Sequence, residues 1–246
     1  MPPKADVRFF KFKDVFTLIN LLLGLWAAIL AVEGRILTGS FVILANWVID
    51  GVDGLVARLT RTSNLFGAKF DDLADLFAYS VAPGFIAYEV YRPASSSVAA
   101  GMCLFIIAVG TIRLARNQAE PIDIPGFWIG FPRPAMGLCV VFLLNSHLFL
   151  DHRLYLPGAV AIFFLGLLSL THVAYISNKN RFNAFQISVI IIAPLTSFLL
   201  YPVGYMWDLA LLWMIVYILT PWIGLKPRTR RDVNSRIDAA RRRQGG

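Results

Sequence analysis

Residues 15–34 read VFTLINLLLGLWAAILAVEG, and Glu33 is the only charged side chain in this stretch. As an α-helix it is long enough to cross the roughly 30 Å hydrocarbon core of a membrane, where a helix satisfies its own backbone hydrogen bonds. Over the whole chain, 57% of the 246 residues are hydrophobic and only 15% are charged. Because a water-soluble domain does not carry so much apolar surface, we predict an integral membrane protein.

Apolar stretches of similar length recur along the chain and predict an all-α bundle of eight transmembrane helices. Besides residues 15–34, the expected spans are 38–59, 71–91, 96–115, 134–151, 157–177, 184–202 and 206–225. The chain therefore divides into a juxtamembrane amphipathic segment at 1–14, a transmembrane domain at 15–225 and a basic tail at 226–246. We expect the tail to be partly disordered and to contact membrane lipids, since it is polar and rich in arginine.

The net charge of +8 is distributed unevenly between the two sides of the predicted bundle. Of the 23 Lys and Arg residues, all but Arg35, Arg92 and Arg153 fall on the side of the two termini. Basic residues accumulate on the cytoplasmic side of membrane proteins. We therefore expect a multi-pass protein with both termini in the cytoplasm, in a bacterial-type inner or plasma membrane, and no nucleic-acid partner.

Five aspartates gather in the second and third predicted spans: Asp50, Asp53, Asp71, Asp72 and Asp75. They lie within 26 positions, although the whole chain has only 15 Asp and Glu residues. An ionisable residue inside a membrane helix is costly and is usually functional. Asp50 and Asp53 share one helix face, and Asp71 and Asp75 share another. Two such helices facing each other would direct four carboxylates to one point.

So dense a group of carboxylates is tolerable when cations neutralise it, and hard oxygen ligands suit Mg²⁺ or Mn²⁺. Asp72 points about 100° away from Asp71 on a regular helix, so we leave it out of the metal set. One alternative is a structural ion-pair network with Arg58 and Lys69. Another is a cation transporter with carboxylates along its pathway.

The aspartates belong to a spaced pattern, which reads Asp50-x-x-Asp53-Gly54-x-x-Ala57-Arg58, then eight residues, then Gly67-x-x-x-Asp71-x-x-x-Asp75. This pattern resembles the signature of the CDP-alcohol phosphatidyltransferases, and every fixed position of that signature is met. The resemblance implies a six-helix catalytic core with a polar cavity open to the cytoplasm, two metal ions and a homodimer. Eight spans instead of six are found in the branch that makes phosphatidylserine.

The resemblance also implies a role for each residue of the signature. The metal ions would be held by the four aspartates Asp50, Asp53, Asp71 and Asp75. The CDP group would lie against the remaining signature residues, which are Gly54, Ala57, Arg58 and Gly67. Asp75 would also be the general base for attack of an acceptor hydroxyl on the β-phosphorus of CDP-diacylglycerol, with CMP as the leaving group.

Two further segments resemble phosphatidylserine synthases: Arg113-Leu-Ala-Arg116, and Gly130-Phe-Pro-Arg133-Pro-Ala. They favour serine as the acceptor alcohol; inositol, inositol phosphate, glycerol 3-phosphate and choline are the alternatives within the family. Arg113, Arg116 and Arg133 are candidate acceptor-binding residues, because a guanidinium binds carboxylates and phosphates well. The alternative is that they are ordinary basic flanks at cytoplasmic helix ends. For Asn20 and Asn46, interhelical hydrogen bonding is the favoured role.

Overall fold

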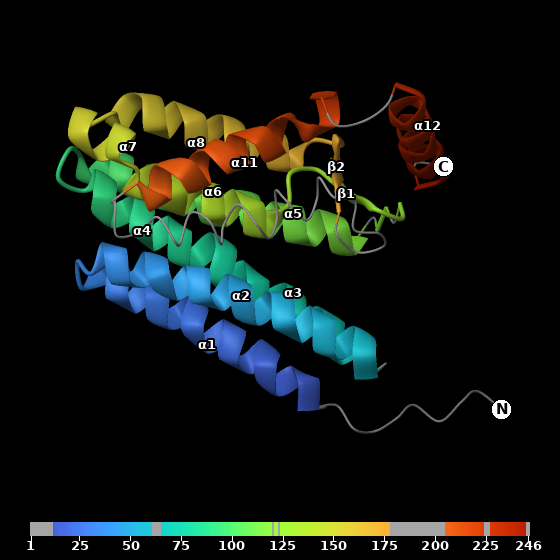
Figure 1. Ribbon diagram of the computed structural model, residues 1–246, viewed down its shortest axis with the longest axis horizontal. Helices are drawn as coiled ribbons and strands as arrows, with labels where there is room; N and C mark the ends of the chain where they lie inside the picture. The colour runs from blue at the N-terminus through green and yellow to red at the C-terminus, as the bar shows by residue number, and fades with distance from the viewer. Residues whose placement is uncertain are drawn as a thin grey trace.

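The computed structural model describes residues 12–60, 65–119, 121–122, 124–177, 205–223 and 227–244. These residues are mostly helical (Figure 1) and form the following elements: α1 (Phe12–Val32), α2 (Ile36–Thr60), α3 (Leu65–Leu76), the π-helical turn η1 (Phe77–Val81), α4 (Ala82–Tyr91), α5 (Ser96–Ala119), β1 (Phe127–Ile129), α6 (Arg133–Asn145), α7 (His147–His152), α8 (Tyr155–Leu170), β2 (Ala174–Ile176), α11 (Met206–Ile223) and α12 (Pro227–Gln244). The predicted span 184–202 and most of the predicted segment 1–14 lie outside the described residues.

The long helices run roughly along one axis of the molecule (Figure 1). α1 packs along α2 and also contacts α3, η1 and α4. α6 packs against η1, α4, α8 and α11, and nearly all of its residues are buried. α6 is therefore the central helix of the bundle, and its N-terminal end lies close to α3.

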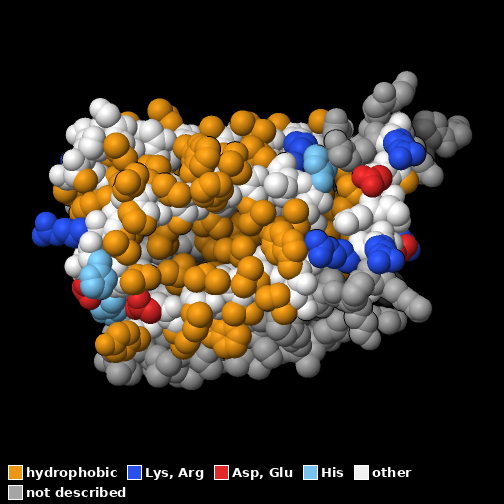
Figure 2. All heavy atoms as spheres, turned by 90° about the horizontal axis from the view of Figure 1, so that it is seen from above, with side chains coloured by type: hydrophobic (Ala, Val, Ile, Leu, Met, Phe, Trp, Pro, Cys, Tyr) orange, Lys and Arg blue, Asp and Glu red, His pale blue; other side chains and the backbone are white. Residues whose placement is uncertain are grey.

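The outer surface of the bundle carries a broad apolar region, with charged side chains gathered towards the two ends (Figure 2). Three described helices are long and apolar enough to cross a membrane: Asp14–Val32, Ser96–Ala119 and Met206–Ile223. The apolar stretches Ile36–Gly51, Arg133–Asn145 and Tyr155–Leu170 are shorter. Together they confirm a helical membrane protein, whereas the number of spans stays a prediction.

The predicted span 157–177 is wrong at its C-terminal end. α8 stops at Leu170, and β2 then pairs antiparallel with β1, with Trp128 opposite Tyr175. Gly126 and Gly130, which flank β1, have positive φ angles of 84° and 74°, a conformation that glycine adopts readily. The described residues thus form a mostly helical protein with one small two-stranded sheet. Hydropathy could not show this, because a short apolar run is compatible with either structure.

The predicted span 134–151 is also divided. α6 ends at Asn145, and the extended residue Ser146 begins the short helix α7 by accepting a hydrogen bond from the Phe149 backbone N–H at 3.3 Å. A serine in this position satisfies one of the amides that a new helix leaves without a partner. The apolar run therefore continues across a real break in the helix.

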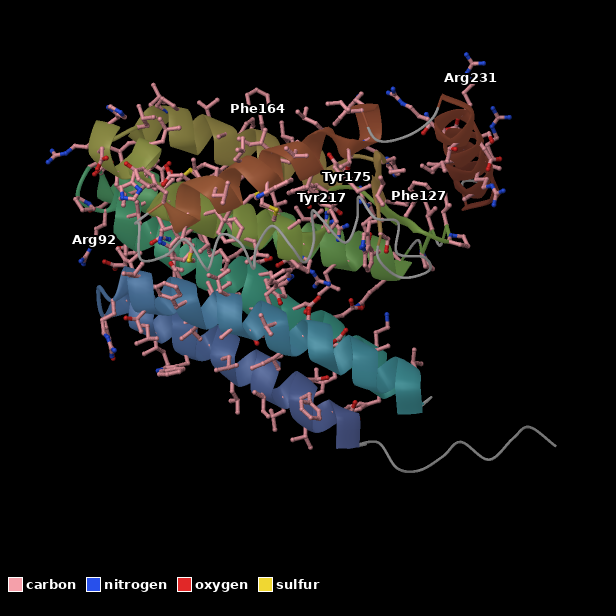
Figure 3. All side chains as sticks on the ribbon, in the orientation of Figure 1. Arg92, Phe127, Phe164, Tyr175, Tyr217 and Arg231 are labelled. Carbon is pink, nitrogen blue, oxygen red and sulfur yellow. The ribbon has the colours of Figure 1, made fainter. Side chains whose placement is uncertain are left out.

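An aromatic cluster links the sheet to the bundle. The Tyr175 and Tyr217 rings lie near one another beside β2 (Figure 3), with centroids 5.9 Å apart. Phe131 packs edge-on against Tyr175 at 5.3 Å, and the Tyr217 hydroxyl donates to the Ile176 carbonyl at 3.1 Å. These contacts fix the sheet to α11.

The basic tail, expected to be partly disordered, instead forms helix α12 over most of its length. This helix lies across the end of the bundle beside the sheet (Figure 1). Val233 and Ile237, four residues apart, share one helix face and are buried against Ile124 and Ile129. Arg231 points away from the bundle (Figure 3) and is exposed. The composition of the tail predicted disorder. The buried apolar pair nevertheless packs α12 against residues at the sheet, which provide a partner surface.

Candidate metal centre

Three aspartates from two helices meet in the structure. Asp50 lies on α2, and Asp71 and Asp75 lie one turn apart on α3. One carboxylate oxygen from each residue lies within 4.8 Å of the others. The predicted convergence of these three side chains is therefore confirmed, and it follows from the four-residue spacing of Asp71 and Asp75 on a helix that faces α2.

The other signature residues are placed only in part. Asp53, Gly54, Ala57 and Arg58 lie on the C-terminal half of α2, but their side chains are outside the described part of the chain. Gly67 is buried on α3. The metal-binding role of Asp53 and the CDP-binding role of the four other residues thus stay predictions, as does the ion-pair alternative that involves Arg58.

Two buried residues orient the Asp50 carboxylate. The Asn20 amide on α1 donates to Oδ1 at 3.5 Å, and the Tyr79 hydroxyl on η1 donates to Oδ2 at 3.4 Å. Asn46 donates to the Asn20 backbone carbonyl at 3.0 Å, so the predicted interhelical hydrogen bonding of these asparagines is confirmed. No local sequence pattern indicated Tyr79, because its position depends on the π-helical turn that follows Asp75.

The π-helical turn is held in place by a close approach of α6. A Cβ atom added to Gly137 would lie 2.5 Å from the Tyr79 carbonyl oxygen, so only glycine allows this contact. Single π-helical turns within α-helices frequently occur at functional sites. Here the wider turn brings the fully buried Tyr79 to the side of the aspartate cluster.

Asp75 has one oxygen that suits a cation. Its Oδ1 atom is buried and has no hydrogen-bond partner among the described residues, while Oδ2 lies 3.9 Å from Arg133 Nη2. A buried carboxylate oxygen without a partner is costly. Oxygen ligands on two helices, close together and of like charge, are the donor set that Mg²⁺ and Mn²⁺ prefer. The three aspartates therefore fit a divalent metal ion.

Asp72 is not among the three aspartates that converge, and its carboxylate pairs with Arg133. Arg133 donates through Nη1 to the Asp72 backbone carbonyl at 2.7 Å and through Nη2 to Oδ1 at 3.2 Å. Gln118 donates to Oδ2 at 3.2 Å. Asp72 thus connects α3 to both α5 and α6, and its exclusion from the metal set stays a prediction.

Arg113 and Arg116 contact backbone carbonyls at the edge of the sheet. Arg113 is 3% exposed and donates to the carbonyls of Ile129 and Gly130 at 3.2 and 3.3 Å. Arg116 donates to the Leu170 carbonyl at the end of α8. Arg113 is therefore more than an exposed basic flank, and an acceptor-binding role for the two arginines stays a prediction.

The arrangement defines a membrane-embedded helical protein with a cluster of carboxylates that fits a metal ion. A family model described as CDP-alcohol phosphatidyltransferase matches residues 12–223, so the chain belongs to this family. The protein is accordingly a transferase of phospholipid biosynthesis, and the cation-transporter alternative is not supported. The family is metal-dependent, in agreement with the aspartate cluster.

Several similar proteins are named CDP-diacylglycerol–serine O-phosphatidyltransferase. The protein of that name from Helicobacter pylori strain J99 is 33% identical over 169 residues, which cover 68% of this chain and 70% of the relative. The one from Methanocaldococcus jannaschii is 33% identical over 172 residues, or 68% of this chain and 75% of the relative. The one from Bacillus subtilis strain 168 is 30% identical over 129 residues, or 52% and 72%.

Proposed function

We propose that the protein transfers the phosphatidyl group of CDP-diacylglycerol to the hydroxyl of L-serine, forming phosphatidylserine and releasing CMP. The observation that carries the reaction type is the convergence of Asp50, Asp71 and Asp75 within 4.8 Å at signature positions of the family. Support for serine comes from the relatives named CDP-diacylglycerol–serine O-phosphatidyltransferase. The same-family alternatives are inositol, inositol phosphate, glycerol 3-phosphate and choline.

The metal ions in this proposal are Mg²⁺ or Mn²⁺, two per site, held by Asp50, Asp53, Asp71 and Asp75. When bound, they would neutralise charge on the pyrophosphate and stabilise the leaving CMP. Asn20 and Tyr79 keep the Asp50 carboxylate in one orientation, which lowers the entropy cost of ordering the site. Gly54, Ala57, Arg58 and Gly67 are proposed to line the CDP site.

Asp75 is proposed to act as the general base. Its Oδ1 atom accepts no hydrogen bond from the described residues, so a lone pair is available for the proton of the acceptor hydroxyl. The new bond forms between the serine oxygen and the β-phosphorus, and the bond from that phosphorus to the CMP oxygen breaks. The aspartate takes the proton, and CMP leaves with the bonding electron pair.

The organisation of the whole chain completes the proposal. We propose eight spans with both termini in the cytoplasm, a polar cavity open to that side and a homodimer. The segments remain 1–14, 15–225 and 226–246, with the last largely formed by α12. The excess of Lys and Arg on the side of the two termini supports this orientation. Arg113 and Arg116 are the proposed acceptor-side arginines.

The test is CMP release by the purified protein in detergent with CDP-diacylglycerol, Mg²⁺ or Mn²⁺, and each alcohol offered separately. We expect release that depends on serine and on the metal. Asp75→Asn should abolish it, whereas Asp151→Asn, an exposed aspartate on α7, should leave it unchanged. Release with a different alcohol would refute the substrate, and no release with any alcohol from folded protein would refute the function.

A further inference from the structure

Arg133 is a buried arginine at the first position of α6, directly after Pro132. Its side chain is 7% exposed, and the Asp72 and Asp75 carboxylates lie 3.2 and 3.9 Å away from Nη2. A charged side chain is rarely buried in a membrane protein without a functional reason or a close partner. Arg133 has such a partner on α3, 61 residues earlier in the sequence.

The contact between Arg133 and Asp72 uses both the backbone and the side chain of the aspartate. Nη1 donates to the Asp72 carbonyl at 2.7 Å, and Nη2 donates to the Asp72 carboxylate at 3.2 Å. The planar fork of a guanidinium can make both bonds at once, which the single ammonium group of lysine cannot do with the same geometry. Two bonds to one residue fix that turn of α3 in both position and rotation.

The location of this turn matters because Asp72 lies directly between the metal-binding candidates. On α3 it follows Asp71 and precedes Asp75, and its side chain points about 100° away from that of Asp71. The two hydrogen bonds from Arg133 on α6 to Asp72 therefore constrain the direction in which Asp71 and Asp75 face α2. Arg133 also faces Oδ2 of Asp75, which leaves Oδ1 as the oxygen without a partner among the described residues.

We propose that Asp72 and Arg133 form a positioning pair for the metal centre, although neither belongs to the family signature. The pair holds α3 in the rotation that directs Asp71 and Asp75 towards Asp50. This inference deepens the proposed function and rests on it for its kinetic test. It also assigns Arg133 a role different from acceptor binding, because the two terminal guanidinium nitrogens, Nη1 and Nη2, both donate to Asp72 on α3.

The test compares Asp72→Asn, Arg133→Gln, the double variant and Arg133→Lys. The first readout is the Mn²⁺ concentration that gives half of the metal-induced thermal stabilisation, and the second is kcat and KM for serine and for CDP-diacylglycerol. Loss of a residue that orients a metal ligand costs about 10- to 100-fold in metal affinity or activity. We expect a loss of that size in each single variant, KM values within about 2-fold of the parent, and no further loss in the double variant.

An exposed pair of the same residue types provides the matched control. Arg236 and Asp232 on α12 lie 3.1 Å apart, with side chains about 60% and 59% exposed. Asp232→Asn, Arg236→Gln and their double variant should leave Mn²⁺ binding and kcat unchanged, since an exposed ion pair contributes little. Arg133→Lys should recover only part of the loss, because lysine keeps the charge but not the fork.

Three results would overturn the inference. A raised KM for serine with unchanged kcat and Mn²⁺ binding in Arg133→Gln would make Arg133 an acceptor-binding residue. Losses that multiply in the double variant would make the two residues independent. If Arg133→Gln does not fold, the double variant decides, because it removes both partners of the Asp72–Arg133 pair, and Mn²⁺ binding equal to the parent would exclude a positioning role. Should the parent release no CMP with any alcohol, the proposed function fails, while the Mn²⁺ measurement still decides the pair.

Discussion

Replacing Gly137 by alanine tests how the centre of the bundle is built. The added Cβ would lie 2.5 Å from the Tyr79 carbonyl oxygen and 2.9 Å from its Cα, and both are backbone atoms that cannot rotate away. α6 must then move off η1, and overpacking of this kind costs about 1–3 kcal/mol. The higher helix propensity of alanine offsets up to about 1 kcal/mol of this cost. We expect net destabilisation of up to about 2 kcal/mol, which is the upper cost less the full gain in helix propensity.

The movement should also reach the metal centre, because Tyr79 donates to Asp50 from the same turn. The assay is thermal unfolding in detergent together with kcat for CMP release. About 1 kcal/mol corresponds to a shift of roughly 2–4 °C for a chain of this size. We expect both a lower midpoint and a lower kcat in Gly137→Ala.

Gly101 on α5 is the matched control, because it is exposed and a Cβ added there would meet nothing within 4 Å. Gly101→Ala should therefore raise stability by up to about 1 kcal/mol through helix propensity alone. A Gly137→Ala variant as stable as Gly101→Ala would refute the account of the α6 contact. Loss of stability with unchanged kcat would separate this contact from the catalytic geometry.

Three further variants test other parts of the structure. Tyr79→Phe removes the hydroxyl bonded to Asp50, so the Mn²⁺ concentration for half-maximal activity should rise about 10-fold, and an unchanged value would argue against a role for that hydroxyl. Ile237→Asp places a charge in the contact between α12 and the sheet, so α12 should detach and trypsin should cleave it faster. Ser235→Asp, on the exposed side of α12, should not change the cleavage rate. Arg113→Met removes the donor to two carbonyls and should cost about 1–3 kcal/mol in unfolding experiments; unchanged stability with a raised KM for serine would instead indicate acceptor binding.

The helical character of the chain and the centre of its site could be predicted from local patterns. Apolar length predicted helices at 15–34 and 38–59, close to the observed α1 and α2. Spacing predicted that Asp71 and Asp75 share a face, because residues four apart on an α-helix always do. The spaced aspartates also led to the correct family. They specify both the residue type and its spacing, whereas apolar helices alone specify neither.

Other features depend on residues that are distant in the sequence. Arg133 and Asp72 are 61 positions apart, and nothing in either local segment indicates that they pair. The same is true of Tyr79 and Asp50, whose contact needs a π-helical turn, and of α12, whose apolar pair needs the sheet as a partner. Hydropathy and periodicity describe one segment at a time, so they predicted most of the apolar helices and the faces that carry carboxylates, but neither the sheet nor α12. Only tertiary packing decided which side chains meet, because each such contact depends on the position of a second segment.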